Sequence, residues 1–333
     1  MSGRKKKKVS KEQLLAAHQK HWPNVAAMGE ELKCSRATIY RLLKSYEIAE
    51  HPEPEAPVEE EFSRYIPEED PSRISRASDK AIEALHDSGE HALLLVGEPG
   101  TGKTTIVEQI AAVLRLPFLR VPCDSSLEFA ELFGWTVLTH GATRFQPGLL
   151  LRMIQAPSVI LFDEVNNLDP GKVSLLYQLL DSHSVFVREA NTLYRLHANA
   201  YLLLAANPPG PGQHGGRVNS ALLSRVMTFE VPPFTQDEVR RYLKERHSDL
   251  ESSMMEKLVR FYVEIRQLCE KQDLPVRFGI REVRKFILAL KATHNAIQAL
   301  HASFLDGIVM LDSVETKRAC EQIVLATFGR LPA

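Results

Sequence analysis

One stretch limits the possible folds of this chain more than any other: residues 91–105, which read HALLLVGEPGTGKTT. Its core, residues 97–104, fits the pattern G-x-x-x-x-G-K-[ST] of a phosphate-binding loop. Glycines in such a loop let backbone N–H groups surround an anion, and the N-terminus of the next helix adds positive potential. The pattern predicts that Lys103 reaches the β- and γ-phosphates of a nucleotide and that the hydroxyl of Thr104 lies on Mg²⁺.

The residues around the loop supply the structural context that the pattern requires. Residues 92–96 form a short apolar run of the kind that a buried parallel strand needs. Residues 105–116 carry Ile106, Ile110 and Val113 on one helical face. The alternative is a turn with an exposed lysine, since the bare pattern occurs in roughly one random chain in a hundred. The flanking strand and helix favour nucleotide binding. The predicted nucleotide-binding residues are Gly97, Glu98, Pro99, Gly100, Thr101, Gly102, Lys103, Thr104 and Thr105.

Bulk properties point to an ordinary globular protein of about two domains. The chain has 333 residues, of which 44% are hydrophobic and 25% charged. No apolar run approaches the roughly 18 residues of a membrane span, and the basic N-terminus lacks the apolar segment of a secretory signal. The cysteines are scattered without C-x-x-C spacing, which favours reduced thiols over zinc or disulfides. We therefore expect a cytoplasmic protein that makes no contact with a membrane.

Charge divides the chain into parts. Residues 1–50 carry eleven Lys and Arg against five Glu, whereas residues 51–70 carry eight acids against one arginine. Opposed blocks of this kind predict a basic module over residues 1–50 and an extended Pro- and Glu-rich linker over residues 51–72. The rest is expected to form an α/β core over residues 73–232 and a helical part over residues 233–333.

The basic module contains three short helical patterns, and a tight turn at residues 33–34 precedes the third. Ser35 is a favourable N-cap for this third helix. Its predicted inward face carries Ile39, Leu42, Leu43 and Tyr46. Its opposite face carries the predicted DNA-contacting residues, Arg36, Tyr40, Arg41 and Lys44.

Two helices joined by a tight turn, the second with a basic outer face, predict a helix-turn-helix that binds duplex DNA. The run LKCSRATIYRLLKSYEI resembles the helix-turn-helix of the Fis and resolvase type. It departs from that family at Lys33, where the turn usually has glycine. The alternative is a three-helix tether for a protein partner, whose charges are merely solvated.

Strand patterns alternate with helical patterns after the phosphate loop, at residues 118–121, 159–162 and 201–205, as in a parallel sheet. The second of these strands ends in Asp163 and Glu164. In phosphate-loop ATPases such an aspartate holds Mg²⁺, and the next carboxylate is placed to act as general base toward water. Asn207 follows the third strand, where it could orient that water or touch the γ-phosphate.

Two hairpins and a run of helices complete the pattern. Turn signals predict a hairpin over residues 135–145 and another over residues 184–196. A capping box at residues 235–238 opens a helix. Long helical patterns follow over residues 251–272, 280–293 and 296–328, which predict an all-helical lid behind the sheet.

Several motifs in order resemble the AAA+ ATPases, and more narrowly the MoxR and dynein-related group of the helix-2-insert clade. The motifs are ELFGW (131–135), FQPGLL (145–150), ILFDEVNNLDP (160–170), LLAANPPG (203–210) and SALLSRV (220–226). The resemblance implies a phosphate-loop fold with a helical lid, ATP and Mg²⁺ as cofactors, and a homo-oligomer, usually a hexameric ring. It also implies that Arg225 is an arginine finger for the neighbouring subunit. Arg281 is implied as a second sensor, with Arg284 as a rival.

The predicted function is an ATP-hydrolysing ring motor that remodels an unidentified protein or nucleoprotein partner and is docked on DNA by its helix-turn-helix. One alternative is a DNA-binding ATP-switch assembly factor that forms filaments, as transposition-type ATPases do. Another is a transcription activator of the alternative-sigma-factor class. These activators carry a GAFTGA loop where this chain reads WTVLTHGATRF, and their DNA module usually lies at the C-terminus. Both hairpins match family elements that project toward the pore, although ordinary packing at a sheet edge explains them equally well.

Overall fold

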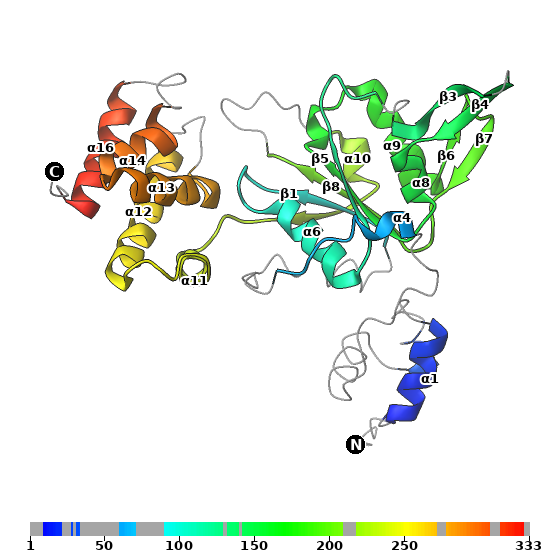
Figure 1. Cartoon of the computed structure of the whole chain (residues 1–333), viewed down its shortest axis with the longest axis horizontal. Coiled ribbons are helices and arrows are strands. Elements are labelled where there is room, and N and C mark those ends of the chain that lie inside the picture. Colours follow the sequence, from blue (N-terminus) through cyan, green and yellow to red (C-terminus); the bar gives the residue numbers. More distant parts are fainter. Residues whose placement is uncertain are drawn as a thin grey trace, which may run out of the picture.

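A computed structural model shows an α/β body, a separate group of helices at the C-terminal end, and a short N-terminal helix (Figure 1). The residues that the structure describes are 9–21, 28, 31–33, 60–70, 90–128, 132–139, 142–208, 218–271, 278–306 and 314–329. None of the helices in these ranges is long and apolar enough to cross a membrane.

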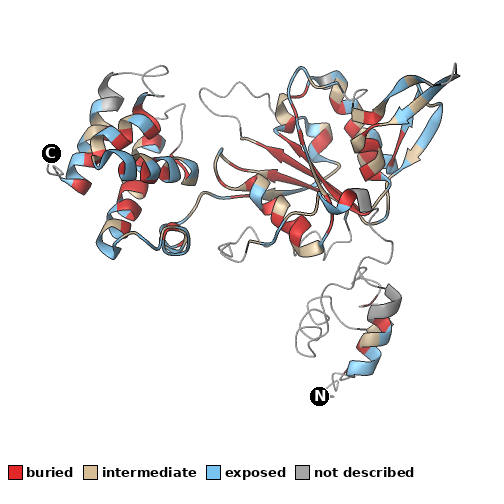
Figure 2. Ribbon diagram, viewed as in Figure 1, coloured by how far each residue is buried: buried red, intermediate tan, exposed pale blue. Residues whose placement is uncertain are grey.

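The body is organised around a five-stranded parallel sheet with the order β2-β5-β8-β1-β9. The strands are β1 (Ala92–Val96), β2 (Phe118–Pro122), β5 (Ser158–Asp163), β8 (Ala200–Ala206) and β9 (Met227–Glu230). The central strands β5 and β8 are buried along their whole length, which explains their uninterrupted apolar sequences (Figure 2). The predicted phosphate-loop fold with a helical lid is confirmed.

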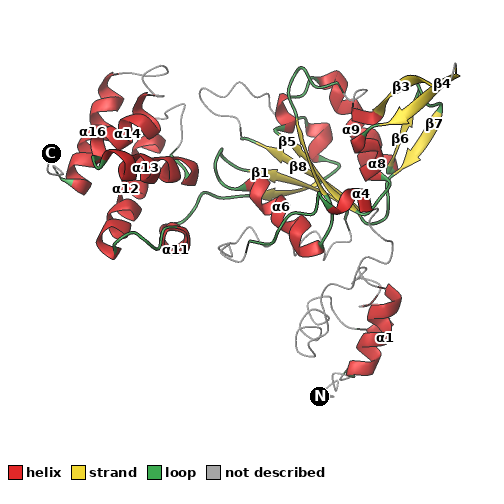
Figure 3. Ribbon diagram, viewed as in Figure 1, coloured by secondary structure: helices red, strands yellow, loops and turns green. Residues whose placement is uncertain are grey.

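Helices cover both faces of the sheet (Figure 3). On one face α6 (Lys103–Leu114) packs Ile106 and Ile110 against strand residues such as Leu203. The other face is covered by α8 (Leu149–Ile154) and α9 (Pro170–Ser182), and α10 (Ser220–Leu223) adds Leu222 to the same cluster. Alternate residues of each strand point to opposite faces, so a single strand contributes to both cores.

Two antiparallel hairpins lie at the end of the body away from the C-terminal helices (Figure 1). The first pairs β3 (Gly134–Thr139) with β4 (Ala142–Pro147), and the second pairs β6 (Ser184–Val187) with β7 (Thr192–Arg195). Asn191 has a φ of 48°, the left-handed conformation that a tight hairpin turn needs. Both predicted hairpins are therefore present.

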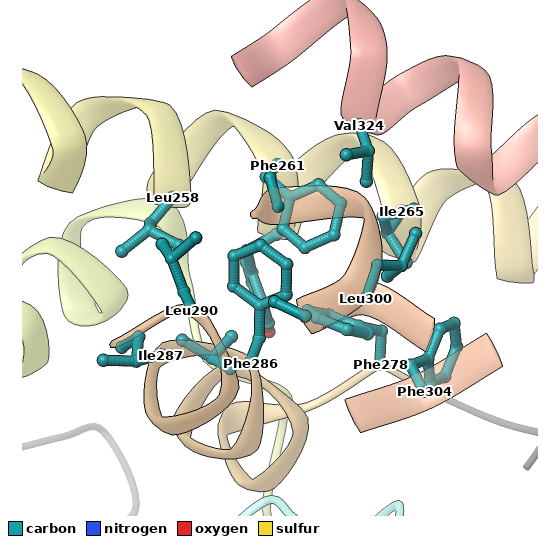
Figure 4. Close-up of a cluster of buried hydrophobic side chains, with 14 of the residues drawn as sticks. Leu258, Phe261, Ile265, Phe278, Phe286, Ile287, Leu290, Leu300, Phe304 and Val324 are labelled. Carbon is teal, nitrogen blue, oxygen red and sulfur yellow. The ribbon is translucent and has the colours of Figure 1, made fainter. Parts of the chain in front are cut away.

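The C-terminal helices, here called the lid, pack around a cluster of phenylalanines (Figure 4). They are α11 (Gln236–Arg246), α12 (Ser252–Lys271), α13 (Ile280–Thr293), α14 (Ala296–Leu300) and α16 (Val314–Phe328). Phe261 makes ring contacts with Phe278, Phe286 and Phe328 at centroid distances of 4.9 to 5.4 Å. Within the predicted helix over residues 296–328, α14 continues into a π-helical segment, His301–Leu305, and α16 begins at Val314; residues 307–313 lie outside the described residues.

The structure differs from the sequence analysis at residues 60–70, which were expected to belong to an extended linker. Helix α4 (Glu60–Ser63) buries Phe62 against the sheet core, and the carbonyl of Tyr65 accepts a hydrogen bond from the backbone of Phe118. Farther along, the backbone N–H of Asp70 donates to the side chain of Gln109 at 3.0 Å. This part of the predicted linker therefore packs on the body through Phe62 and Tyr65. Its acidic composition had outweighed these two aromatic residues in the prediction.

The basic module is described only in part. Helix α1 (Lys11–His21) buries Leu14 and Ala17, and Met28 is also buried. Lys33 has a φ of 53° at the predicted turn, so a non-glycine residue there adopts the left-handed conformation that usually favours glycine. The predicted third helix, with Arg36, Tyr40, Arg41 and Lys44, lies outside the described residues.

Candidate functional site

The phosphate-loop residues form the turn between β1 and α6, as the pattern predicts. Gly100 and Gly102 have φ values of 83° and 91°, which glycine adopts without strain. A Cβ atom at Gly97 would lie 2.5 Å from the carbonyl oxygen of Val231, so the backbone there approaches β9 too closely for a side chain. Thr101 closes the turn by donating its hydroxyl to the carbonyl of Glu98 at 2.9 Å.

The side chain of Lys103 lies inside this loop and is almost fully buried. Its Nζ donates to the carbonyls of Gly97 and Glu98 at 2.6 and 3.0 Å and to Oδ1 of Asn207 at 2.8 Å. Burial lowers the pKa of Lys103 to about 8, although the nearby carboxylates of Asp163 and Glu164 favour the charged form. The amine is therefore a cation whose three hydrogen-bond acceptors are neutral oxygens. An anion that enters the loop can replace these acceptors.

Asp163 ends β5 beside the loop and is buried, so its carboxylate needs partners. Oδ2 accepts hydrogen bonds from the Thr104 hydroxyl at 3.0 Å and from Nε of Arg120 at 2.8 Å. Oδ1 accepts from the backbone N–H of Glu164 at 3.1 Å. Sequence reasoning missed Arg120, although an arginine two residues before the end of the otherwise apolar β2 was a usable signal.

A carboxylate and a hydroxyl 3.0 Å apart at the mouth of a phosphate loop fit Mg²⁺, which takes one or two protein oxygens and completes its shell with phosphate and water. Thr104 and Asp163 are therefore the residues that would hold the ion. No cluster of three or more His, Cys, Asp or Glu residues suited to a metal exists within the described part of the chain.

Glu164 follows in the left-handed conformation, with a φ of 57°. This backbone turn separates its side chain from that of Asp163 and leaves it exposed at the edge of the sheet. One oxygen, Oε2, accepts a hydrogen bond from Nδ2 of Asn167 at 3.1 Å. A solvent-accessible carboxylate with one oxygen held in place is suited to accept a proton from water.

Asn207 lies directly after β8, the strand between β1 and β5. Its Oδ1 accepts from Lys103, while its backbone N–H donates to Oδ1 of Asn166 at 3.2 Å. Asn166 belongs to a 3₁₀ turn, Val165–Asn167, that follows Glu164. Three neighbouring strands thus bring Lys103, Asp163 and Asn207 together at their carboxyl ends.

A cavity of about 710 Å³ opens between this edge of the sheet and the lid. The lid side is lined by residues of α11 and α13, including Arg281 and Arg284. The charge of Arg281 acts on Lys103 and lowers its pKa, after the larger effect of burial. Burial raises the pKa of Tyr242 and lowers that of His247, and Arg284 lowers both. Arg281 therefore belongs to the phosphate-loop end of the cavity and Arg284 to the end near Tyr242.

Two ion pairs that sequence reasoning did not find join the lid to the body. Arg266 of α12 donates Nη2 to Oε2 of Glu98 at 2.8 Å, which ties the lid to the phosphate loop. Arg246 of α11 pairs with Asp70. Glu98 takes part in the loop twice, through its carbonyl to Lys103 and through its carboxylate to Arg266. The position of the lid is thus connected to the geometry of the phosphate loop through Arg266 and Glu98.

Arg225 is the one predicted residue of the ATP site that the structure keeps apart from the others. It lies just after α10 and is not among the residues that line the cavity. Its Nε pairs with Asp181 at 2.8 Å, and its Nη1 donates to the carbonyl of Ala221 at 2.7 Å. Within one chain, therefore, this arginine does not reach the phosphate loop.

Comparison with known proteins agrees with this geometry. Residues 92–226 match the family described as "AAA domain (dynein-related subfamily)". Protein NorQ of Paracoccus denitrificans is 25% identical over 259 residues, which cover 78% of this chain and 94% of NorQ. The denitrification regulatory protein NirQ of Stutzerimonas stutzeri is 25% identical over 242 residues, which cover 71% of this chain and 85% of NirQ.

A third relative is much longer. Midasin of Dictyostelium discoideum is 29% identical over 176 residues, which cover 52% of this chain but 3% of midasin. The likeness to midasin thus concerns a small part of that protein, whereas NorQ and NirQ are matched over most of their length. The matched segment and the arrangement of Lys103, Asp163 and Asn207 within it together indicate an ATPase, whose residues 92–226 are similar to AAA domains of the dynein-related subfamily.

Proposed function

We propose that this chain is a MoxR-like AAA+ ring motor that hydrolyses ATP to remodel a protein or nucleoprotein partner and is docked on DNA by residues 1–50. The observation that carries the ATPase part is the meeting of Lys103, Asp163 and Asn207 at one edge of the sheet, under Arg281 of the lid. The division into residues 1–50, 51–72, 73–232 and 233–333 is part of the proposal, with residues 60–70 counted as packed on the body.

Each residue has a role that follows from its position. Lys103 exchanges its carbonyl partners for phosphate oxygens when ATP binds, and the backbone N–H groups of residues 97–105 surround the phosphates. Thr104 and Asp163 would hold Mg²⁺, which would neutralise phosphate charge when bound. Glu164 accepts a proton from the attacking water, Asn207 senses the γ-phosphate, and Arg281 contacts it from the lid. Arg225 serves the site of a neighbouring copy because it cannot reach its own.

The depressed pKa of Lys103 predicts proton uptake on nucleotide binding. With a pKa of about 8 before binding, much of the amine is neutral at pH 8.5. Bound phosphate favours the charged amine, so ATP binding should take up protons, and more of them at pH 8.5 than at pH 7.5. ATP affinity should accordingly fall as the pH rises above 8. Titration calorimetry in two buffers of different ionisation enthalpy measures this uptake, and its absence at pH 8.5 would contradict the role of Lys103.

The partner-binding part of the proposal rests on the hairpins. Within the described part of the chain, five large apolar side chains are about half exposed or more. One of them, Leu288 (57%), lies on α13 of the lid, and the other four are Trp135 (52%), Leu138 (77%), Phe186 (49%) and Leu193 (50%). These other four belong to β3, β6 or β7, at the end of the body away from the lid (Figure 1). Exposed apolar residues concentrated on projecting elements are typical of surfaces that bind other proteins.

The DNA-docking part is tested by the steady-state ATPase rate with and without duplex DNA. The full chain is compared with a chain that starts at His51, which keeps the buried Phe62. A full-length variant with Arg36, Arg41 and Lys44 replaced by Ala is the matched control. We expect DNA to stimulate only the unaltered full chain, since removing phosphate contacts weakens binding to any sequence.

Two other results are informative. If all three proteins hydrolyse ATP equally and ignore DNA, the basic module does not dock the motor on DNA and the protein-tether alternative takes its place. If DNA stimulates the shortened chain as much as the full one, DNA acts on the ATPase body and not through residues 1–50. Neither result affects the assignment of the ATP site.

A further inference from the structure

We infer that Asp181 and Tyr177 of α9 are positioning residues, which hold the guanidinium of Arg225 in the pose in which it serves a neighbouring copy. This inference rests on the proposed role of Arg225. Neither residue lines the ATP cavity of its own chain, and neither was singled out by the sequence.

The contacts of Arg225 fix the guanidinium on two edges and one face. Its Nε donates to Oδ2 of Asp181 at 2.8 Å, and its Nη1 donates to the carbonyl of Ala221 at 2.7 Å. The guanidinium carbon lies 4.5 Å from the centre of the Tyr177 ring, within the range of a cation–π contact. Within the described part of the chain Nη2 makes no hydrogen bond, so one edge of the fork stays available to an anion.

Helix α9 makes a rigid support for this arrangement. Tyr177 and Asp181 are four residues apart and therefore share one face of the helix. The opposite face is anchored in the core by Leu176 and Leu179, which are fully buried. Helix α9 begins shortly after the turn that follows Glu164 and ends near Arg225. It therefore runs from the ATP site of its own chain to the arginine proposed to serve the site of a neighbouring copy.

The exposure of the ion pair argues for positioning over stabilisation of the fold. The side chain of Asp181 is 50% exposed and that of Arg225 is 29% exposed. Ion pairs this open to solvent contribute little to folding stability. Restraining a long, flexible arginine before it meets the phosphate, in contrast, removes an entropic cost from the reaction, and an error of about 1 Å in such a group can cost a hundredfold in rate.

The test compares ATP turnover of Asp181→Ala, Tyr177→Leu and Tyr177→Phe with that of the unaltered chain. We expect kcat to fall roughly tenfold in Asp181→Ala with KM for ATP almost unchanged, because the altered side chains lie outside the cavity that binds ATP. Tyr177→Leu should lose more than Tyr177→Phe, which keeps an aromatic face. The control is Asp237→Asn, which removes one of the two carboxylate partners of Arg240 on the lid surface and should leave turnover unchanged.

Mixing experiments separate positioning from a general defect. Asp181→Ala is mixed with Glu164→Gln, which lacks the proposed base but keeps a correctly held Arg225. We expect turnover above that of either protein alone, since the Asp181→Ala site then receives its arginine from the other copy. Arg225→Ala mixed with Glu164→Gln is the reference.

The outcomes distinguish this inference from the proposed function. If the Arg225→Ala mixture recovers turnover and the Asp181→Ala mixture does not, the Asp181 defect is internal to its own chain and the positioning role is wrong. Normal kcat in Asp181→Ala alone also overturns it. If the Arg225→Ala mixture fails as well, the shared site itself is wrong and the proposed function falls with it.

Discussion

Replacing Glu164 by Gln is expected to abolish ATP turnover while ATP still binds. The amide keeps the size of the side chain but cannot accept a proton from water, and removal of a general base costs typically a hundredfold to ten-thousandfold in rate. Binding should survive because the side chain lies beyond Asp163 at the exposed edge of the site and makes no bond to the phosphate loop. Steady-state phosphate release measures turnover, and a fluorescent ATP analogue measures binding.

The control is Glu256→Gln, which changes a carboxylate of the same kind that pairs with Arg240 on the lid surface. It should hydrolyse ATP at the unaltered rate. Undiminished turnover in Glu164→Gln would remove this residue as the base and direct attention to another proton acceptor near the cavity. Loss of ATP binding in Glu164→Gln would show that the substitution disturbs the loop itself.

Replacing Arg225 by Ala is expected to have an equally large effect for a different reason. An arginine that reaches the transferred phosphate is worth roughly a thousandfold or more in kcat. The loss should appear in kcat and not in ATP binding, because Arg225 lies outside the cavity of its own chain. Its absence removes a partly exposed ion pair with Asp181, one hydrogen bond to the carbonyl of Ala221 and the contact with the Tyr177 ring, so the fold should tolerate the change.

Arg240→Ala is the comparison for this variant, since the side chain of Arg240 is 27% exposed, close to that of Arg225, and is also held by carboxylates, namely Asp237 and Glu256. It should turn over ATP normally. A normal rate in Arg225→Ala would show that no arginine from this position completes the site. A loss of ATP affinity there would point to a role within the same chain.

The sequence could predict those parts of the site in which neighbouring residues of the chain indicate both the chemical role of a residue and its location in the fold. The phosphate loop carries its function in eight consecutive residues, and Asp163 and Asn207 each come at the end of a short apolar run of the kind that a buried strand needs. Parallel strands end at the same edge of a sheet, so these residues were expected to meet near Lys103, and they do.

The parts that escaped prediction depend on distant pairing. Arg266 meets Glu98 across 168 positions of sequence, and nothing in either local pattern links them. The edge strand β9 was missed because most of its residues are exposed, which removes the apolar signal. Residues 60–70 were taken for linker because their charge outweighed Phe62 and Tyr65, the two residues that attach them to the body.

The central claim is that a complete ATP site needs two copies of this chain, one supplying the cavity with Glu164 and the other supplying Arg225. The most direct test mixes Glu164→Gln with Arg225→Ala, each expected to be inactive alone, and measures ATP turnover as the mixing ratio is varied. The claim predicts that turnover returns and is greatest at intermediate ratios, where an intact cavity most often meets an intact Arg225. If turnover stays at the level of the separate proteins at every ratio, although both bind ATP, the two residues do not act across a shared site.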